Sequence, residues 1–364
     1  MKKILFALST MNIGGVEKSL ISLLKKIPKD EYEVTIILLE KKGGFLNDIP
    51  KWVEVKEVNW FKNLKPLIIE SPYTIIRNFI DKRDIVNTIK YPFIYLISTR
   101  LDNRYFYYKN IFKNIEVEKE YYDYAISYAG PTEILDYYIL NKINAKEKIS
   151  WIHFDLSKHE INKKFYQKVF SKFDKLVLVS ESSKKILNSM FKNTANKSSV
   201  FLNVIDREEI IKKSCEDINF DTDFDGIKIL TVGRLSKEKG QDIAINVLSK
   251  LKKEGFNVRW YCIGEGFERK YYENLISNLN LNNEFILLGG MKNPYPYIRE
   301  ADLYVQPSRH EGYCLTLAEA IILNKKIVAT NFTGANEQLI NIDNGFVVDC
   351  NVEDITNKIK QLIS

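Results

Sequence analysis

The chain has 364 residues, of which 45% are hydrophobic and 28% charged, as is typical of a soluble globular protein long enough for two domains. No apolar run reaches the ~18 residues that a membrane-spanning helix needs. Four cysteines without C-x-x-C spacing and only three histidines argue against a disulfide framework or a zinc cluster. The formal net charge of +7 is concentrated in one segment, residues 61–115.

The first half of the chain alternates apolar runs with helical patterns. Its start resembles a signal peptide, but the apolar run is only about five residues long and leads into a glycine loop. We therefore predict a first strand over residues 3–9 of a cytoplasmic protein. Further strands are predicted over 32–40, 124–128, 148–152, 176–180 and 200–204, and helices over 16–27, 132–140, 158–170 and 182–191. This alternation indicates βαβ units and a parallel sheet.

Residues 61–115 interrupt the alternation with a basic, aromatic segment. It contains ten Lys/Arg and four Asp/Glu, a local net charge of +6, together with runs such as Arg104-Tyr-Phe-Tyr-Tyr-Lys109. One interpretation is a helical insert whose aromatic residues are buried. The other is a patch that meets an anionic membrane surface, since cations with interleaved aromatics suit lipid headgroups. We do not expect nucleic-acid binding, because no other feature resembles a nucleic-acid module.

The second half repeats the alternation more cleanly after a charged stretch over residues 206–225. Strands are predicted to begin near Lys228, Val258, Glu284, Leu303, Lys326 and Gly345, with helices between them. We predict an N-terminal domain over residues 1–205, which includes the insert, and a C-terminal domain over 206–364. Each would be a doubly wound, Rossmann-like α/β domain with a parallel sheet, and ligands would bind in a cleft between the two.

Two motifs of the second half follow strands and open helices. Gly233-Arg234 with Lys239-Gly240 supplies two cations, which suit a diphosphate. Glu311 and Glu319 flank the start of a helix near Cys314, and carboxylates suit the hydroxyls of a ribose or hexose. The N–H groups at such a helix start, here in the stretch Gly312-Tyr313-Cys314-Leu315, attract anions. The combination predicts a site for a sugar nucleotide.

The first half offers two further candidates at strand ends. Gly15 lies between a strand and a helix, where the absence of a side chain would let a phosphate or sugar approach the backbone. His153 follows the apolar stretch that ends at Ile152, and its imidazole could donate to a sugar hydroxyl or a phosphate. The alternative for His153 is a structural, hydrogen-bonded histidine.

Taken together, these motifs make the chain resemble a known family. The motifs that carry the resemblance, in chain order, are Gly15 with Glu17, Trp151-Ile-His153, Asn203-Val-Ile-Asp206, Gly233-Arg234 with Lys239-Gly240, Gly264-Glu-Gly266 and Glu311 with Glu319. The same order is seen in family-4 glycosyltransferases, which are retaining enzymes of the GT-B fold, with two Rossmann-like domains facing across a cleft. The match is good in the second half and confined to scattered points in the first.

The resemblance implies a role for each matching residue. Arg234 and Lys239 would hold the donor diphosphate, Glu319 the donor ribose and Glu311 the transferred sugar. His153 would bind that sugar near its reacting centre. No metal or other cofactor would be needed, because the two cations and the helix amides supply the positive charge. Many relatives carry a further helix after the position of Ser364.

We therefore expect a retaining glycosyltransferase of cell-surface polysaccharide synthesis. It would move a hexose or N-acetylhexosamine from a nucleotide-sugar, with a UDP-sugar as the expected donor, to a glycan or lipid-linked acceptor. We expect it in the cytoplasm, peripheral on the inner face of the cell membrane. The alternatives are a sugar-nucleotide epimerase of the same fold and a non-catalytic protein that binds sugar nucleotides.

Overall fold

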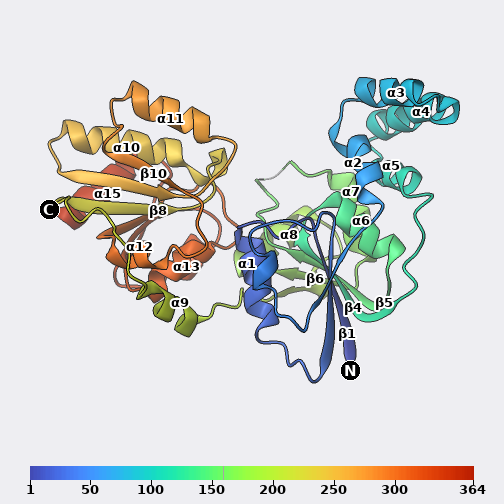
Figure 1. Ribbon diagram of the computed structural model, residues 1–364, viewed down its shortest axis with the longest axis horizontal. Coiled ribbons are helices and arrows are strands. Elements are labelled where there is room, and N and C mark those ends of the chain that lie inside the picture. Colours follow the sequence, from blue (N-terminus) through green and yellow to red (C-terminus); the bar gives the residue numbers. More distant parts are fainter. Residues whose placement is uncertain (159) are drawn as a thin grey trace. The chain divides into compact units, whose positions relative to one another are not determined.

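The computed structural model describes residues 1–158 and 160–364, so His159 lies outside the described residues. The described chain forms two compact units that are not contiguous in sequence. The first comprises Met1–Asn12, Leu23–Val179 and Lys184–Leu202, and the second comprises Ile13–Ser22, Ser180–Ser183 and Asn203–Ser364. Most of the first helix therefore belongs to the second unit, although it follows the first strand of the first unit (Figure 1).

The first unit is built on a seven-stranded sheet with the order β3-β2-β1-β4-β5-β6-β7. All neighbouring strands are parallel. The strands are β1 (Lys2–Leu8), β2 (Tyr32–Leu38), β3 (Glu54–Glu57), β4 (Tyr121–Gly130), β5 (Asn144–Ile152), β6 (Lys175–Leu178) and β7 (Ser198–Val200). The helices of this part of the chain, apart from the insert, are α1 (Gly15–Leu24), α6 (Glu133–Lys142), α7 (Lys163–Lys172) and α8 (Glu181–Met190), with short 3-10 turns at Leu46–Asp48 and Ala195–Lys197.

The second unit is built on a six-stranded, all-parallel sheet with the order β10-β9-β8-β11-β12-β13. Its strands are β8 (Ile227–Val232), β9 (Val258–Ile263), β10 (Phe285–Gly289), β11 (Leu303–Gln306), β12 (Lys326–Thr330) and β13 (Gly345–Val348). Its helices are α9 (Arg207–Ser214), α10 (Gln241–Lys253), α11 (Arg269–Asn278), α12 (Tyr295–Glu300), α13 (Leu315–Ile322), α14 (Ala335–Leu339) and α15 (Val352–Ile363), with a 3-10 turn at Lys237–Lys239.

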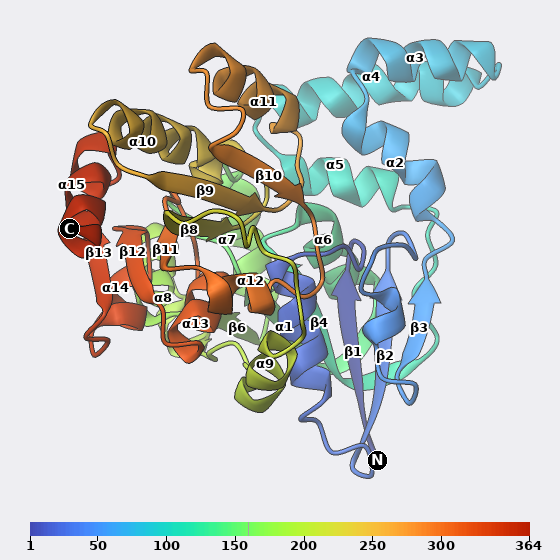
Figure 2. The same cartoon turned by 60° about the vertical axis from the view of Figure 1, so that its left-hand side comes forward.

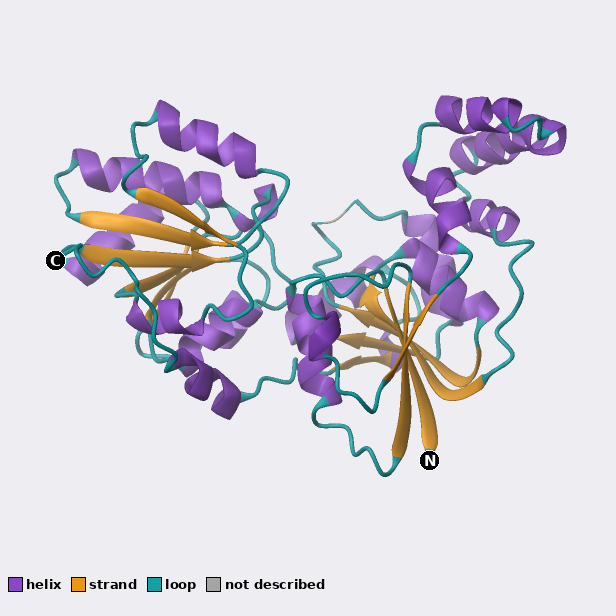
Figure 3. Cartoon of the chain, viewed as in Figure 1, coloured by secondary structure: helices purple, strands orange, loops and turns teal. Residues whose placement is uncertain are grey.

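Helices cover both faces of the second sheet (Figures 2 and 3). One apolar cluster joins the sheet to α10, α11 and α15, and another joins its opposite face to α9, α12, α13 and α14. Because both faces are covered, strands such as β8 and β11 consist mostly of apolar residues. The parallel arrangement brings the carboxyl ends of all six strands to one edge, where ligands of such sheets bind.

The basic aromatic segment forms four helices, α2 (Phe61–Ile69), α3 (Pro72–Asp81), α4 (Ile85–Arg100) and α5 (Arg104–Ile111). The tyrosines of α5 at positions 105, 107 and 108 are buried, and Arg104 pairs with Glu133 at 2.9 Å. The run Arg104–Lys109 is therefore largely part of the interior of the unit. The helix pair α3–α4 is different, because many of its large apolar residues are exposed.

Most predicted strands are found near their predicted positions, and 227–232 coincides with β8. The last predicted strand of the first half, over residues 200–204, is wrong, because the chain pairs with β6 through Ser198–Val200 and the two ranges share only Val200. None of the helices in the described part of the chain is both long enough and apolar enough to cross a membrane.

Candidate functional site

Two loops meet at the carboxyl edge of the second sheet. One follows β8 and contains Arg234 and Lys239, and the other follows β11 and leads into α13. The two strands are neighbours in the sheet, so the loops are adjacent as well. The backbone N–H of Arg309 donates to the carbonyl of Glu238 at 2.7 Å, and the Arg309 guanidinium binds both carboxylate oxygens of Asp242 at 2.8 and 2.6 Å. These contacts fix the two loops to each other.

Gly240 allows the loops to come this close. Its φ of 72° lies in the left-handed region, which favours glycine. A Cβ atom at this position would lie 2.0 Å from the carbonyl oxygen of Pro307 in the facing loop. Glycine is thus required both by the backbone conformation and by the approach of the second loop.

Lys239 and Glu311 form a partly buried ion pair across these loops. The Nζ atom of Lys239 lies 2.5 Å from Oε1 of Glu311, which also accepts from the Ser308 hydroxyl at 2.9 Å. Burial by itself lowers the pKa of Lys239, but the Glu311 carboxylate outweighs it, so the net pKa of Lys239 is raised above its ordinary value. Lys239 is therefore a stable cation held beside a carboxylate.

A chain of hydrogen bonds from the strand supports Glu311. The Tyr304 hydroxyl donates to the Gln306 amide oxygen at 2.7 Å, and the Gln306 amide nitrogen donates to Ser308 at 2.8 Å. Thr316 on α13 donates to Gln306 at 3.3 Å. The sequence analysis missed this supporting chain. Its only signal was polar residues at the end of an otherwise apolar strand.

The stretch Gly312-Tyr313-Cys314-Leu315 brings the chain into α13, with Cys314 as the residue that precedes the helix. Burial, with the nearby Glu311 charge, raises the pKa of the Cys314 thiol to about 12. The thiol stays protonated at neutral pH and is not a nucleophile. Burial also raises the pKa of the Tyr313 hydroxyl. Among the charged groups that could act on a ligand here are Lys239, Glu311 and Glu319.

Glu319 is the fifth residue of α13 and is buried. One of its oxygens, Oε1, lies 2.5 Å from the ammonium of Lys18, which sits 4.6 Å above the ring of Tyr295. The other oxygen, Oε2, is buried and has no hydrogen-bond partner among the described residues. An unpartnered buried carboxylate oxygen costs free energy and can accept a hydrogen bond from a ligand hydroxyl.

Lys18 and Gly15 reach this site because Ile13–Ser22 belongs to the second unit. Gly15 is the first residue of α1, and a Cβ atom there would lie 3.6 Å from Cδ1 of Leu315. The structure thus brings Gly15 to the start of α13, as well as Lys18, which the sequence analysis overlooked. A lysine after a glycine loop has no feature that distinguishes it from the many surface lysines of this chain.

Arg234 differs from Lys239 in its surroundings. Its side chain is exposed and forms no ion pair within the described chain, while its backbone carbonyl accepts from the Gln241 amide at 2.8 Å. Burial raises the pKa of the nearby Glu17 carboxyl, and the charge of Arg234 partly opposes this rise. The backbone of Arg234 is therefore held in place, and its exposed guanidinium can bind an anion.

His153 lies in the first unit, directly after β5. Its backbone N–H donates to the carbonyl of Gly130 at 3.0 Å, and its ring lies 4.7 Å from that of Tyr128. Burial lowers the pKa of the imidazole to about 3, so it is neutral at physiological pH. Its Nε2 atom is buried without a hydrogen-bond partner in the described structure. The first unit thus contains a neutral histidine that can form one more hydrogen bond.

Within residues 1–158 and 160–364, no group of three or more His, Cys, Asp or Glu side chains is arranged to hold a metal ion. The predicted site residues of the second unit come together around the start of α13. His153 belongs to the first unit.

The architecture is that of the GT-B class, in which two parallel-sheet α/β units make up the chain. HepE of Anabaena, solved in complex with UDP and glucose, matches all of this chain and 90% of its own chain with a TM-score of 0.69 and 19% identity. TarM of Staphylococcus aureus matches all of this chain and 92% of its own with a TM-score of 0.67 and 15% identity. At these identities the likeness establishes the fold.

Residues 216–364 match the family model described as glycosyl transferases group 1. An uncharacterised glycosyltransferase of Methanocaldococcus jannaschii is 30% identical over 177 residues, which is 47% of this chain and 44% of the relative. The N-acetylgalactosamine-N,N'-diacetylbacillosaminyl-diphospho-undecaprenol 4-alpha-N-acetylgalactosaminyltransferase of Campylobacter jejuni is 29% identical over 195 residues, 53% of this chain and 52% of the relative. The chain thus spans about half the length of the curated relatives that it matches.

Proposed function

We propose that this protein is a retaining glycosyltransferase. It would transfer a hexose or N-acetylhexosamine from a nucleotide-sugar, with UDP as the nucleotide, to a glycan or lipid-linked acceptor of cell-surface polysaccharide synthesis. The observation that carries the proposal is the set of groups around the start of α13. Arg234 and Lys239 supply two cations, and Glu311 and Glu319 supply two carboxylates, one of which has an unpartnered buried oxygen. The family of residues 216–364 and the UDP complex of HepE support the same conclusion.

In the proposed reaction the second unit stabilises the leaving group. As the glycosidic bond to the diphosphate breaks, negative charge grows on the phosphate oxygen, and Arg234 lies at the loop that would face it. The ammonium of Lys239 has three N–H donors, so it can hold Glu311 and still donate to a phosphate. Cations held in place before the reaction stabilise such charge without reorganisation. No metal is required in this scheme.

The carboxylates would orient the sugar nucleotide. Glu319 Oε2 would accept from a ribose hydroxyl, and Glu311, held by Ser308, would accept from a hydroxyl of the transferred sugar. In the first unit, the neutral His153 would use its free Nε2 for a sugar hydroxyl near the reacting carbon. Gly15 and the stretch Gly312–Leu315 would let the donor approach the backbone. Such positioning lowers the entropic part of the barrier.

Two measurements test the proposal. UDP should raise the melting temperature in the presence of a chelator, and at a hundred times its dissociation constant the gain is about 2.7 kcal/mol. Stabilisation that requires a divalent ion would contradict the metal-free scheme, and stabilisation by GDP alone would change the assigned donor. With UDP-sugars and a crude glycan acceptor, the protein should release UDP. A changed sugar without lasting transfer would indicate an epimerase, and binding without turnover would indicate a non-catalytic protein.

We also propose that the enzyme works peripherally on the inner face of the cell membrane. The name of the Campylobacter relative contains a diphospho-undecaprenol acceptor, which is a membrane lipid. A lipid-linked acceptor would require the enzyme to reach the bilayer surface. The expected result is partial recovery of the protein with the membrane fraction, reduced at high salt.

A further inference from the structure

The helix α4 is apolar on two opposite faces. At about 100° per residue, Tyr91, Ile94, Tyr95 and Ser98 share one face. Tyr91 and Ser98 are buried there, and Tyr91, Ile94 and Tyr95 join a small apolar cluster with Ile75 and Tyr107. The opposite face spans an arc of about 120°. It consists of Ile85, Val86, Ile89, Phe93, Leu96 and Ile97, each exposed by 38–72%; we name these six residues the α4 stripe.

A surface helix of a water-soluble domain normally has one apolar face and one polar face. On α4 the side opposite the buried face is not polar, because the α4 stripe occupies it from Ile85 to Ile97. Tyr73 and Ile80 on the neighbouring α3 are exposed too. Scattered single apolar residues on a surface are ordinary, but a contiguous patch of this kind marks a surface that another phase or molecule covers.

The charges around the α4 stripe indicate what covers it. Lys90 and Arg100 are the charged residues within α4, and both are exposed and form no ion pair within the described part of the chain. Arg100 lies within the arc of the stripe and Lys90 at its edge. Lys82 and Arg83, in the turn before α4, are exposed as well. The surface therefore offers free positive charge beside apolar side chains.

The carboxylates at the two ends of α4 are already in use. Asp84 is the N-cap and accepts from the backbone N–H of Asn87 at 3.0 Å. Asp102 accepts from the amide of Asn162 and lies 3.6 Å from the ammonium of Lys164. Residues 71–102 contain five Lys/Arg and three Asp, so the hairpin keeps a net charge of +2. Its surface therefore complements one that is negative outside and apolar inside.

We propose that the α3–α4 hairpin docks on an anionic lipid bilayer. The helix would lie in the membrane plane, with the α4 stripe at the boundary of headgroups and acyl chains and with Arg100 and Lys90 on lipid phosphates. At 16 residues α4 is about 24 Å long, which is shorter than the hydrocarbon core of about 30 Å. The inference extends the membrane location of the proposed function by assigning the surface and its ligand.

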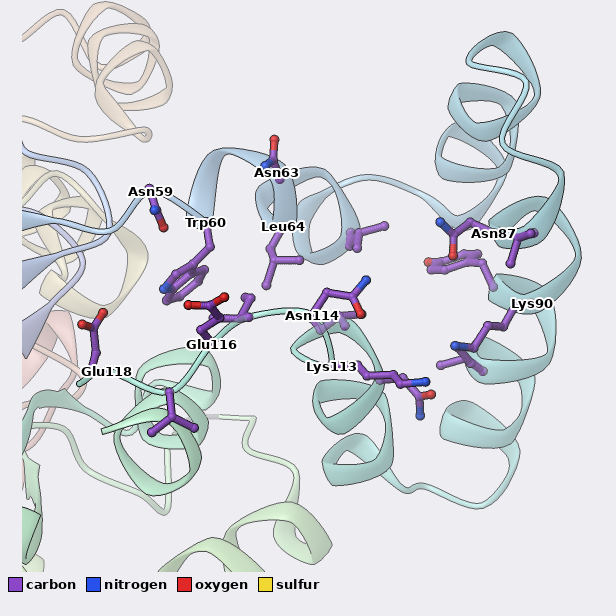
Figure 4. Close-up of a pocket in the computed structure, with 18 of the residues that line it drawn as sticks. Asn59, Trp60, Asn63, Leu64, Asn87, Lys90, Lys113, Asn114, Glu116 and Glu118 are labelled. Carbon is purple, nitrogen blue, oxygen red and sulfur yellow. The ribbon is translucent and has the colours of Figure 1, made fainter. Parts of the chain in front are cut away.

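The hairpin is attached to the rest of its unit in a way that suits this role. It packs on α2 and α5, and a pocket of about 1230 Å³ opens between α4 and these elements. Figure 4 shows Asn87 and Lys90 on the α4 side of this pocket and Asn63 and Leu64 on α2 across from them. The main apolar core of the unit does not include the α4 stripe. The stripe therefore stays exposed on the hairpin.

The test is co-sedimentation with lipid vesicles, using the full chain. Wild type should bind vesicles of phosphatidylcholine with one-third phosphatidylglycerol and bind pure phosphatidylcholine at least about tenfold more weakly. The double variant Ile89→Glu/Phe93→Glu places two charges on exposed positions of the stripe and should lower binding to the anionic vesicles at least about tenfold. Lys90→Gln/Arg100→Gln should reduce the dependence on anionic lipid and on salt.

The matched control is Tyr271→Glu/Ile340→Glu, which places two charges on exposed apolar residues of the second unit and should bind as wild type does. Equal sedimentation of wild type and Ile89→Glu/Phe93→Glu would overturn the docking surface. Equal recovery on neutral and anionic vesicles would overturn the role of the cations. A lipid-free dimer that the stripe variant converts to monomer would assign the stripe to a second copy instead.

The outcome is independent of the reaction. Vesicle binding needs no substrate, and release of UDP with a water-soluble glycan acceptor needs no lipid. A chain that binds vesicles but releases no UDP would retain the docking surface and lose the proposed function. A stripe variant that releases UDP normally but no longer sediments with vesicles would support both.

Discussion

The two units of this protein differ in how their buried polar side chains are stabilised. At the strand ends of the second unit, buried carboxylates are paired with ammonium groups, as in Lys239–Glu311 and Lys18–Glu319. In the first unit the buried polar groups include a neutral histidine, His153, and Asp136, whose carboxyl pKa burial raises to about 6. Removing one partner of an ion pair should therefore lower the stability of the second unit most. A change of pH should alter the stability of the first unit.

The largest effect is expected for Lys239→Ala. The change leaves the Glu311 carboxylate buried without its cation, and breaking a buried pair in this way costs about 3–5 kcal/mol of unfolding free energy. Denaturant unfolding would measure the loss. The double variant Lys239→Ala/Glu311→Gln also removes the unpaired Glu311 charge, so it should recover a large part of the lost unfolding free energy. If the double variant were no more stable than Lys239→Ala, the pair would not be the source of the effect.

Arg234→Ala should act on turnover and leave stability nearly unchanged. The side chain is exposed and unpaired within the described chain, so the fold does not depend on it. Losing one preorganised charge at a developing anion costs about 3 kcal/mol, or roughly a hundredfold in rate. Steady-state release of UDP would be compared with the denaturant midpoint of the same samples. Lys237→Ala, an exposed lysine of the same loop, is the control. An unfolded Arg234→Ala would point to a structural role instead.

His153 should make the first unit sensitive to acid. Its folded pKa of about 3 lies below the ordinary value of about 6.5. Between these values the unfolded chain binds a proton that the folded chain does not, so stability falls as pH decreases. The difference in unfolding free energy between wild type and His153→Gln should shift by about 2 kcal/mol from pH 7 to pH 5.

Asp136 acts in the opposite direction, because its raised pKa contributes stability that is present at low pH and lost as pH rises through about 6. The comparison of wild type with His153→Gln is needed for this reason, since Asp136 is common to both. A pH-independent difference would show that the imidazole is not buried in its neutral form.

The smallest effect is expected for Arg104→Gln. Arg104 pairs with Glu133 at 2.9 Å and lies over the rings of Tyr107 and Tyr108, in a half-buried setting where such pairs contribute about 1 kcal/mol. Its loss should lower the denaturant midpoint slightly and leave vesicle binding unchanged. A loss of vesicle binding equal to that of Lys90→Gln/Arg100→Gln would indicate that α5 also contacts the membrane.

The sequence predicted the elements of the second unit well, because each strand is a compact apolar run. Residues 227–232 could be assigned because four of the six are apolar, as is typical of a strand largely buried on both faces, with Lys228 and Thr231 as the polar exceptions. Edge strands were harder. The sequence analysis missed β3, because the charged residues of Glu54–Glu57 do not produce an apolar run.

The candidate site was predictable only in part. Arg234, Lys239, Glu311 and Glu319 could be found because they follow strands at fixed spacing. The pairing of Lys18 with Glu319 depends on a segment from the start of the chain that packs with the second unit, and local pattern carries no information on such distant contacts. For α4 the sequence was ambiguous for a physical reason: with apolar residues on two opposite faces, periodicity cannot tell a core face from an exposed one.

The small cluster of Ile75, Tyr91 and Tyr107 has a consequence for folding cooperativity. It forms a core of its own, apart from the large cluster that joins the sheet of the first unit to α6 and α7. A helix pair with so few buried contacts opens at a lower free energy than the sheet does. Amides of α3 and α4 should therefore exchange with deuterated solvent well before those of β4 and β5, and a bound surface that buries the exposed side of α4 would slow that exchange selectively.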